Sequence, residues 1–390
     1  MNQRMRIALL SWESLNSIPV GGVAVHVTEL AAALERKGHE VHIFTRMGHG
    51  QPTLERIHGV WYHRCPFDLD PNFVQEIVAM CRSFAHHVVA TEDHMGAGFD
   101  IVHAHDWLAA LAMTWIQQRG RKGILTMHST EFGRCGNHFC GEDSGRIREI
   151  ERHATYVAHR VVSVSHALKS ELQWMYNVPD WKVDVVYNGV SAKPFDGWLD
   201  DPGQIRAGYG IGPMDPTVLF VGRMAYQKGP DLLVEAVPML LHHYPNAKFV
   251  FAGDGHLKGH CEGRAHQLGV AHACRFLGYR NGVELVNLYK ICDTVCVPSR
   301  NEPFGMTVLE AWSAGKPVIA SSNGGPGEFV WHEVNGLKVH PDPQPIAWGL
   351  GTLFTNFDWA RWMGANGRRG VDTAFTWDAV ADHILAVYHH

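Results

Sequence analysis

Residues 6–46 read RIALLSWESLNSIPVGGVAVHVTELAAALERKGHEVHIFTR and contain the pattern that decides the fold. Two short apolar runs, RIALLS and EVHIFTR, flank the segment HVTELAAALERKG. Within that segment Val27, Leu30, Ala31 and Leu34 form one apolar stripe at helical spacing, and Gly38 is suited to end the helix. A strand, a helix and a second strand in this order predict parallel strands joined by a crossover helix.

The same alternation runs along most of the chain. It recurs before residue 193 in DIVHAH, GILTMHS and RVVSVS, and after residue 216 in TVLFVGR, KFVFAGDG, CRFLGY, TVCVPS and PVIASS. Residues 193–216 are rich in Gly, Pro and Asp and indicate a connection between two halves. We therefore predict an α/β protein with two doubly wound parallel-sheet domains, 1–200 and 201–372, facing a cleft, and a final helix over 373–390 bracing them.

Composition excludes several classes of function. The chain has 390 residues, 46% hydrophobic and 19% charged, as in soluble globular proteins. The net charge of −5, with Lys and Arg scattered, argues against a nucleic-acid partner, and no apolar run is long enough to predict a membrane span. The start lacks the apolar core of a signal peptide, and the eight cysteines lack the density of a disulfide scaffold. We expect reduced thiols and a cytoplasmic location; the oligomeric state is not indicated.

The histidines and cysteines do not predict a metal site. The run CGNHFC contains Cys135, His138 and Cys140, but a structural zinc site needs four ligands and no second pair has matching spacing nearby. Most of the 27 histidines are expected to be surface or structural residues, and the terminal His389 and His390 are given no role. We predict no metal and no other cofactor.

Two loops at predicted strand ends have the composition of phosphate-binding sites. Gly21 and Gly22 allow close approach of the backbone, and the helix that follows offers free amides to an anion; the alternative is an ordinary turn. In VGRMAYQKG, Gly222 precedes Arg223 and Lys228, a basic pair placed to neutralise a diphosphate; the alternative is a solvated surface pair.

A third such stretch is SRNEPFGMTVLE, residues 299–310. Pro303 suits a first helical turn, so the helix start offers three amide donors, those of Gly305, Met306 and Thr307. Glu310 falls one to two turns into that helix and can accept both hydroxyls of a ribose. Glu302, before the turn, would reach what lies beyond the phosphates. Together these residues predict a ligand of the type ribose, diphosphate, sugar.

At this point the chain resembles the retaining glycosyltransferases of family 4, which have the GT-B architecture. Glu302 and Glu310 form the E-x7-E pattern of that family. Further landmarks stand in the expected order along the whole chain: the Gly21–Gly22 loop, HAHDW from residue 103, VVYNGV from 185, GRMAYQKG from 222, AGDG from 252 and GGPGE from 324.

The resemblance implies a nucleotide-sugar site in the second domain and an acceptor site in the first. It implies that Arg223 and Lys228, with the amides of residues 305–307, stabilise the departing diphosphate without a metal. Glu310 would hold the ribose and Glu302 would face the donor sugar. His105 would contact the transferred sugar; from the residues alone, His103 and His105 are equally well a structural pair at a strand end. Asp106 either orients a histidine or caps the helix that starts at Trp107.

No residue has the setting of a covalent nucleophile, so we predict a front-face displacement with retention. In it the acceptor hydroxyl passes its proton to the leaving phosphate. Asp68 and Asp70 spell D-x-D, the metal signature of the other glycosyltransferase fold, but they lie beside prolines in the first half, away from the predicted phosphate sites. We interpret that match as chance.

The run TMHSTEFGR, residues 126–134, is similar to the glycogen-synthase-like branch. That similarity implies a glucosyl donor, ADP-glucose or UDP-glucose, and an acceptor that is a sugar, a glucan or a small phosphorylated or carboxylated compound. His128, Glu131 and Arg134 become acceptor-binding candidates, although Glu131 and Arg134 are also suited to an internal salt bridge. The alternative functions are a nucleotide-sugar epimerase or hydrolase of the same fold, and a non-catalytic nucleotide-sugar-binding protein.

Overall fold

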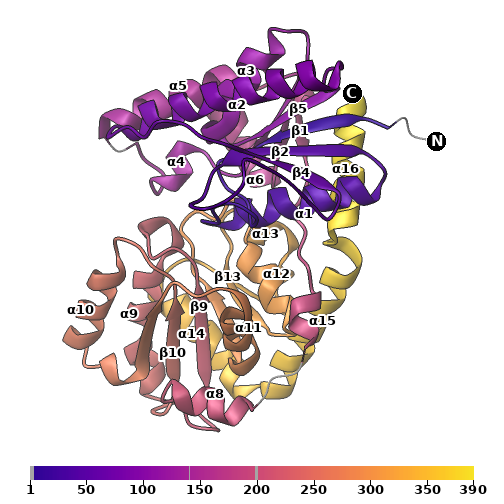
Figure 1. Cartoon of the computed structure of the whole chain (residues 1–390). Helices are drawn as coiled ribbons and strands as arrows, with labels where there is room; N and C mark the ends of the chain where they lie inside the picture. The colour runs from indigo at the N-terminus through magenta and orange to yellow at the C-terminus, as the bar shows by residue number, and fades with distance from the viewer. Residues whose placement is uncertain (1–3, 140, 198–200) are drawn as a thin grey trace. The chain divides into compact units, whose positions relative to one another are not determined.

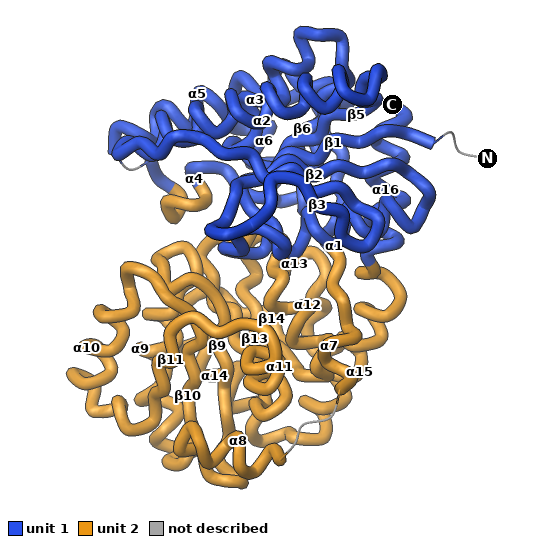
Figure 2. Tube along the Cα trace, viewed as in Figure 1, with its two compact units in different colours: residues 1–132, 138–188, 377–390 blue, residues 133–137, 189–376 orange. Residues whose placement is uncertain are grey.

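The computed structural model describes residues 4–139, 141–197 and 201–390, which form two compact units (Figure 2). Unit 1 comprises residues 1–132, 138–188 and 377–390, and unit 2 comprises residues 133–137 and 189–376. The chain thus changes unit at residue 189, where the sequence predicts a boundary at 200, and its final helix belongs to unit 1. Residues 133–137 are held to unit 2 by a hydrogen bond from Asn301 Nδ2 to Asn137 Oδ1, 2.7 Å long.

Unit 1 is built on an eight-stranded sheet in the order β3-β4-β2-β1-β5-β6-β7-β8. All neighbouring strands are parallel except β3 and β4, which form a hairpin through His58 and Gly59, both with positive φ. This edge hairpin, which was not predicted, adds one antiparallel pair to the predicted doubly wound sheet. The strands are β1 (Arg6–Leu10), β2 (Glu40–Arg46), β3 (Leu54–Ile57), β4 (Val60–Cys65), β5 (Ile101–His105), β6 (Lys122–Met127), β7 (Arg160–Ser163) and β8 (Val183–Val185).

Helices cover both faces of this sheet; α2, α3 and α5 lie on one face, and α1 and α16 on the other (Figure 1). The predicted stripe of α1 is confirmed, because Val27, Leu30, Ala31 and Leu34 are buried and the helix ends just before Gly38. The helices of unit 1 are α1 (Gly22–Arg36), α2 (Phe73–Met95), α3 (Trp107–Gln117), α5 (Gly141–Val157), α6 (His166–Tyr176), η1 (Asp180–Lys182) and α16 (Trp377–His389), and α4 (Glu131–Arg134) lies where the chain passes to unit 2.

Unit 2 contains a six-stranded parallel sheet in the order β11-β10-β9-β12-β13-β14. Its strands are β9 (Thr217–Val221), β10 (Lys248–Ala252), β11 (Cys274–Gly278), β12 (Thr294–Val297), β13 (Val318–Ser321) and β14 (Leu337–Val339). The helices are α9 (Pro230–Leu241), α10 (Lys258–Gln267), α11 (Gly282–Ile291), α12 (Met306–Ser313), α13 (Pro326–Phe329), α14 (Pro343–Thr355) and α15 (Phe357–Ala374), with η2 (Tyr226–Lys228) and η3 (Ala271–Ala273). Phe220, Phe249 and Phe251 are buried in its core. The predicted pair of α/β halves is confirmed.

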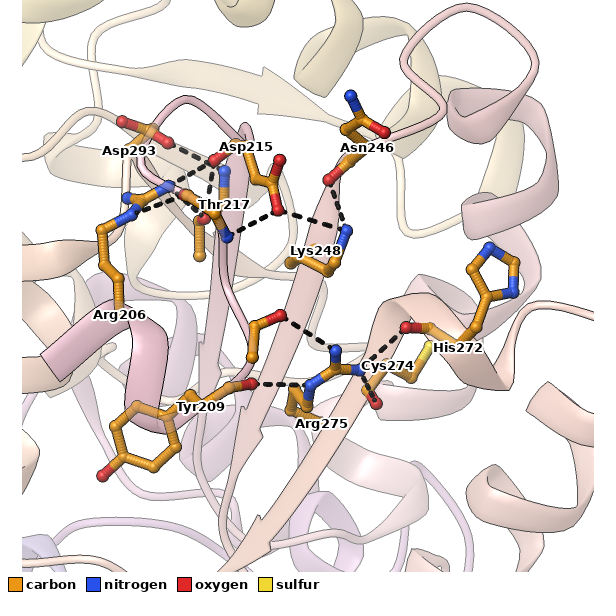
Figure 3. Close-up of polar contacts among 12 residues, drawn as sticks. Arg206, Tyr209, Asp215, Thr217, Asn246, Lys248, His272, Cys274, Arg275 and Asp293 are labelled. Atoms are coloured by element: carbon orange, nitrogen blue, oxygen red, sulfur yellow. Dashed lines mark hydrogen bonds and ion pairs between the residues drawn. The ribbon is translucent and has the colours of Figure 1, made fainter. Parts of the chain in front are cut away.

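The connection predicted over residues 193–216 contains two short helices, α7 (Lys193–Asp196) and α8 (Pro202–Gly208). Arg206 of α8 is buried, and its guanidinium donates to the carbonyls of Gly212, Asp215 and Ile291 and to the hydroxyl of Thr217 (Figure 3). The carboxylate of Asp293 accepts the amide of Thr217 at 2.8 Å. These contacts fix the connection to the amino end of β9, so the carboxyl edge of the sheet is left for the loops described below.

No helix in the described part of the chain combines the length and apolar character needed to cross a membrane. The cysteines Cys65, Cys81, Cys261, Cys274, Cys292 and Cys296 are buried thiols. Cys140 of the CGNHFC run lies outside the described residues.

Candidate active site

The predicted phosphate-binding residues of unit 2 gather at one edge of its sheet. Gly222 and Arg223 directly follow β9, and Ser299 and Glu302 follow the neighbouring strand β12. Because parallel strands end at the same edge, these loops lie side by side at the carboxyl ends of the strands, the usual ligand position in open α/β sheets.

Lys228 and Glu302 meet at this edge. The ammonium of Lys228 lies 2.9 and 2.8 Å from the two carboxylate oxygens of Glu302, and the hydroxyl of Ser299 donates to Oε2 at 2.9 Å. Glu302 is buried and Lys228 is half-buried, so the pair is shielded on the glutamate side. An anionic ligand at Lys228 must therefore compete with a carboxylate of the chain itself.

Arg223 lies on the same loop as Lys228 but is exposed. One guanidinium nitrogen donates to Gln227 Oε1 at 2.9 Å, and Gln227 itself is buried. The two cations predicted to neutralise a diphosphate thus come from one loop, with η2 placing Lys228 above the carboxyl end of β9.

The helix after Glu302 starts later than predicted. It is α12, which begins at Met306 with Gly305 as N-cap, so Pro303 lies outside the helix and does not form its first turn. Gly305 has no side chain to occupy the first amides, and no side-chain cap is present there. The hydroxyl of Thr307 reaches back towards the carbonyl of Val221, at 3.4 Å, which ties the helix start to the end of β9.

Glu310 lies on α12 with its carboxylate bound by a buried tyrosine. The hydroxyl of Tyr289, on α11, donates to Glu310 Oε2 at 2.5 Å. Burial raises the pKa of Glu310 above its usual value, and the hydrogen bond from Tyr289 opposes that shift. Tyr289 therefore fixes the direction of the carboxylate that the E-x7-E pattern predicts to hold a ribose.

The other loops of this edge fit only because two glycines lack side chains. A Cβ on Gly253, after β10, would stand 1.9 Å from the carbonyl oxygen of Gly222. A Cβ on Gly324, after β13, would stand 2.1 Å from the carbonyl oxygen of Glu302. The AGDG and GGPGE runs thus let neighbouring loops press against the residues that flank the predicted diphosphate site.

In unit 1 the Gly21–Gly22 loop is already occupied. Glu13 Oε2 accepts hydrogen bonds from the amides of Val20 and Gly21 at 2.7 and 2.5 Å. The sequence predicted that the amide of Gly21 would be free, and in the structure it is bound. Burial raises the pKa of Glu13, while the two amides lower it. The loop does bind an anion, but that anion is a carboxylate folded back from eight residues upstream.

Four histidines of unit 1 lie together with their rings in contact. His26 comes from α1, His103 and His105 from β5, and His128 from the residue after β6. The ring nitrogens of His103 lie 2.7 Å from Tyr388 Oη and 2.6 Å from Thr126 Oγ1, so the structural interpretation holds for His103. His105 Nδ1 lies 3.2 Å from His128 Nε2, and His105 Nε2 is buried without a hydrogen-bond partner among the described residues.

The histidine cluster is neutral. Burial, followed by the neighbouring imidazoles, holds the pKa of His26, His103 and His105 well below the usual value. Burial lowers the pKa of His128 to about 3. At neutral pH these rings act as hydrogen-bonding or ligating groups, and not as cations.

Asp106 precedes α3 as its N-cap residue, and its carboxylate binds the backbone that carries a histidine. Its carboxylate makes no capping bond to α3, and Oδ1 accepts the amides of His128 and Ser129 at 2.7 and 3.4 Å. Its φ of 57° is uncommon for a residue with a side chain. The residue thereby fixes the backbone that carries His128.

The acceptor candidates lie around α4. Glu131 is buried and accepts a hydrogen bond from Ser144 Oγ at 2.7 Å, and its amide donates to Glu151 Oε2 at 3.1 Å. Arg134 closes α4 and is half-buried.

Several residues of the site were not predicted from the sequence. They are Glu13, His26, Ser299 and Tyr289, which contact the predicted residues from elsewhere in the chain. The signal for Ser299 was its place three residues before Glu302. Glu13, His26 and Tyr289 had none, because only the folded chain brings them to their partners.

Comparison with known proteins shows the family to which the chain belongs. The family described as "Glycosyl transferases group 1" matches residues 202–370, and "Glycosyltransferase Family 4" matches residues 20–193. The uncharacterized glycosyltransferase MJ1607 of Methanocaldococcus jannaschii is 37% identical, over 98% of each chain. The protein belongs to the family 4 glycosyltransferases.

Two further similarities agree with the resemblance drawn from the motifs. The glycogen synthase of Mycobacterium tuberculosis is 27% identical over 98% of this chain and 94% of its own. Among solved structures, the sucrose-phosphate synthase from Thermosynechococcus elongatus superposes with a TM-score of 0.84, at 25% identity, covering 99% of this chain and 98% of that one. The GT-B fold and the glycogen-synthase-like branch are confirmed.

Proposed function

We propose that the protein is a retaining hexosyltransferase that moves glucose from ADP-glucose or UDP-glucose to a carbohydrate-type acceptor. The observation that carries the proposal is the meeting of Lys228 and Glu302 at the carboxyl edge of the unit 2 sheet, with Arg223 on the same loop. Unit 2 would hold the nucleotide sugar and supply Arg134, and unit 1 would supply His105 and His128.

The chemistry proposed for unit 2 is stabilisation of the leaving group. As the bond between the sugar and the diphosphate breaks, negative charge grows on the phosphate oxygens. Arg223, Lys228 and the amides of residues 305–307 would stabilise that charge, and the backbone amides at the start of α12 are already in place before the reaction. In the absence of a ligand the carboxylate of Glu302 binds the ammonium of Lys228, and the diphosphate would replace that carboxylate. This chemistry requires no metal at the diphosphate.

The proposed step is a front-face displacement. The acceptor oxygen bonds to the anomeric carbon on the side that the diphosphate leaves, and the acceptor proton passes to a leaving phosphate oxygen. The protein then supplies position and electrostatics, while Glu310, directed by Tyr289, holds the ribose.

The acceptor proposal rests on the relatives. One relative is a glycogen synthase and one structural neighbour is a sucrose-phosphate synthase, names that point to a glucan and to a phosphorylated sugar. His128 and Arg134 are the half-buried residues of the TMHSTEFGR run that we propose for the acceptor.

The test is transfer measured with Lys228→Met and Arg223→Met, each against the unchanged protein. Loss of one fixed cation should lower kcat roughly 100- to 1000-fold, the size found when one transition-state donor is removed. Lys248→Met is the matched control, since Lys248 starts β10 at the opposite edge of the same sheet and pairs with Asp215. Unchanged kcat in Lys228→Met and Arg223→Met, with folding intact, would remove the leaving-group argument.

Two rival functions are separated by incubation with donor alone. An isomerised sugar, or free sugar released as fast as transfer occurs, would indicate an epimerase or a hydrolase. Binding of the nucleotide without turnover on a broad acceptor panel would indicate a binding protein. A thermal-shift panel of ADP, UDP, ADP-glucose and UDP-glucose selects the donor, because a ligand raises the unfolding temperature according to its affinity.

A further inference from the structure

Three histidines of unit 1 lie close together in the fold. His26 of α1, His105 of β5 and His128 after β6 can each offer a ring nitrogen, and these nitrogens all lie within 4.8 Å of one another. It is the one such group of histidine, cysteine and acidic side chains found in residues 4–139, 141–197 and 201–390. His26 and His105 are 2% and 1% exposed, whereas His128 is half-buried and gives the group a route to solvent.

Two buried ring nitrogens of this group have no hydrogen-bond partner in the described part of the chain. His26 Nε2 and His105 Nε2 are buried and make no hydrogen bond to any described residue. His26 Nδ1 lies 2.8 Å from Asn188 Oδ1, which can only accept, so the proton sits on Nδ1 and the lone pair on Nε2. A histidine held by its other nitrogen in this way is the usual arrangement of a metal ligand.

The spacing of the other two rings also fits an ion. His105 Nδ1 and His128 Nε2 are 3.2 Å apart. Two nitrogens bound to one tetrahedral ion at about 2.0–2.1 Å lie roughly 3.3 Å from each other. His103, stacked beside His105, is excluded as a ligand because Tyr388 and Thr126 lie at hydrogen-bond distance from both of its nitrogens.

We propose that His26, His105 and His128 form a binding site for one divalent transition-metal ion of the Zn²⁺ type. Imidazole nitrogens suit zinc, copper and nickel, while a set of three ligands without a carboxylate does not suit magnesium or calcium. Three protein ligands leave a fourth position for water or for an oxygen of a bound molecule. All three ligands belong to unit 1. Two of them, His105 and His128, are also the residues proposed above for the transferred sugar and the acceptor, so a bound ion and these ligands would share the same side chains.

The test uses the full chain, stripped with EDTA and titrated with Co²⁺. Cobalt bound by three imidazoles in a four-coordinate site gives visible absorption bands that weak surface sites do not, and Zn²⁺ should abolish them. We expect one such ion per chain. His26→Gln and His128→Gln should each remove the bands, and Asn188→Ala should weaken binding roughly 10- to 100-fold, because it removes only the group that orients His26.

The chain has 27 histidines, so a matched control is needed. His242 and His243 are exposed neighbours with ring centroids 4.7 Å apart, and replacing both with Gln should leave the bands unchanged. Bands that are absent from the unchanged protein, or that survive in folded His26→Gln and His128→Gln, would overturn the proposal. Should His26→Gln not fold, the half-buried His128 carries the test alone. If removal of the metal abolishes sugar transfer, the proposed metal-independent chemistry is wrong, whereas the proposed ion site is still supported.

Discussion

Glu310 shows how a single residue of the candidate active site can lower the stability of the folded protein. Its carboxylate sits in the fold where burial disfavours the charge, and a single tyrosine hydroxyl, that of Tyr289, offsets part of the cost. A ribose with two hydroxyls would supply the donors that the unliganded site lacks. We therefore propose that Glu310 serves a ligand, because the burial of its carboxylate works against the stability of the empty protein.

This leads to a prediction for Glu310→Gln. Because the pKa of Glu310 is raised in the folded protein, the contribution of this group to stability is most favourable below the ordinary glutamate pKa and is lost as pH rises through the folded pKa. Gln cannot ionise and still accepts from Tyr289, so its unfolding midpoint at pH 7.5 should exceed that of the unchanged protein, and the gap should close towards pH 4. Nucleotide affinity should nonetheless fall about 10- to 100-fold, because two hydrogen bonds to a charged group are weakened.

Thermal unfolding at several pH values and calorimetric titration with the nucleotide check both parts. Glu333→Gln, at an exposed position of unit 2, is the control and should show neither effect. A variant less stable than the unchanged protein at pH 7.5 would mean that Glu310 contributes through its charge, and this account of the site would be wrong.

The residues of the site were predictable where chemistry and spacing lie within one segment. Arg223 with Lys228, and Glu302 with Glu310, fall within nine residues of each other and follow strands, so the pattern placed them at one edge. The pairing of Lys228 with Glu302 joins residues 74 positions apart and was not predictable. Nor was the carboxylate of Glu13 in the Gly21 loop, since a glycine pair reads the same whether its amides are free or occupied.

At the scale of elements, α8 turns a predicted loop into a fixed part of unit 2. Its helix is capped by Asp201, whose carboxylate accepts the amides of Gly203 and Gln204, with Pro202 in the first turn. Arg206 then binds carbonyls from its own loop and from the end of α11 (Figure 3). A Gly- and Pro-rich composition predicts turns correctly, but it does not reveal a buried arginine that organises them.

We predict that Arg206→Met lowers the free energy of unfolding of unit 2 by about 3 kcal/mol. The buried carbonyls and the hydroxyl of Thr217 would lose a charged donor that no other group replaces. Chemical denaturation followed by fluorescence measures the change. Arg264→Met is the control, because Arg264 pairs with Glu235 at the surface and such pairs contribute about 0–1 kcal/mol. Equal effects of the two substitutions would show that Arg206 is no more than a surface cation.

The strands were the most predictable elements. Short apolar runs separated by amphipathic helices allow little besides a parallel sheet with crossovers, and both sheets follow that rule. Four strands, β3, β4, β8 and β14, were not among the predicted runs. The clearest case is β3, whose sequence LERI is exposed and lacks the apolar signal of a strand. Its place is fixed by the two-residue turn at His58 and Gly59, which brings it against β4.

At the scale of the whole molecule, the chain leaves unit 1, builds unit 2 and returns. Val190 donates to the carbonyl of Phe375 at 2.9 Å, so the segments that enter and leave unit 2 are joined inside that unit. The last helix, α16, then packs in unit 1 against α1, with Val380, Ile384 and Leu385 buried. The two ends of the segment 189–376 are thus joined by a hydrogen bond within unit 2. The fold of unit 1, in contrast, is completed only by residues that follow unit 2 in the sequence.

The final prediction concerns α16. A chain ending at Thr376 loses the buried face of α16 and the hydroxyl of Tyr388, which lies 2.7 Å from His103 Nδ1. Unit 1 should then become protease-sensitive and exchange its amide hydrogens rapidly, while unit 2 stays protected. Tyr388→Phe, which removes the hydroxyl alone, should cost about 1–3 kcal/mol, because it leaves a buried imidazole nitrogen without its partner. Arg36→Ala, which breaks an exposed ion pair with Asp378, is the control and should change little. Simultaneous loss of protection in both units of the shortened chain would show that unit 2 is not closed by its own contacts.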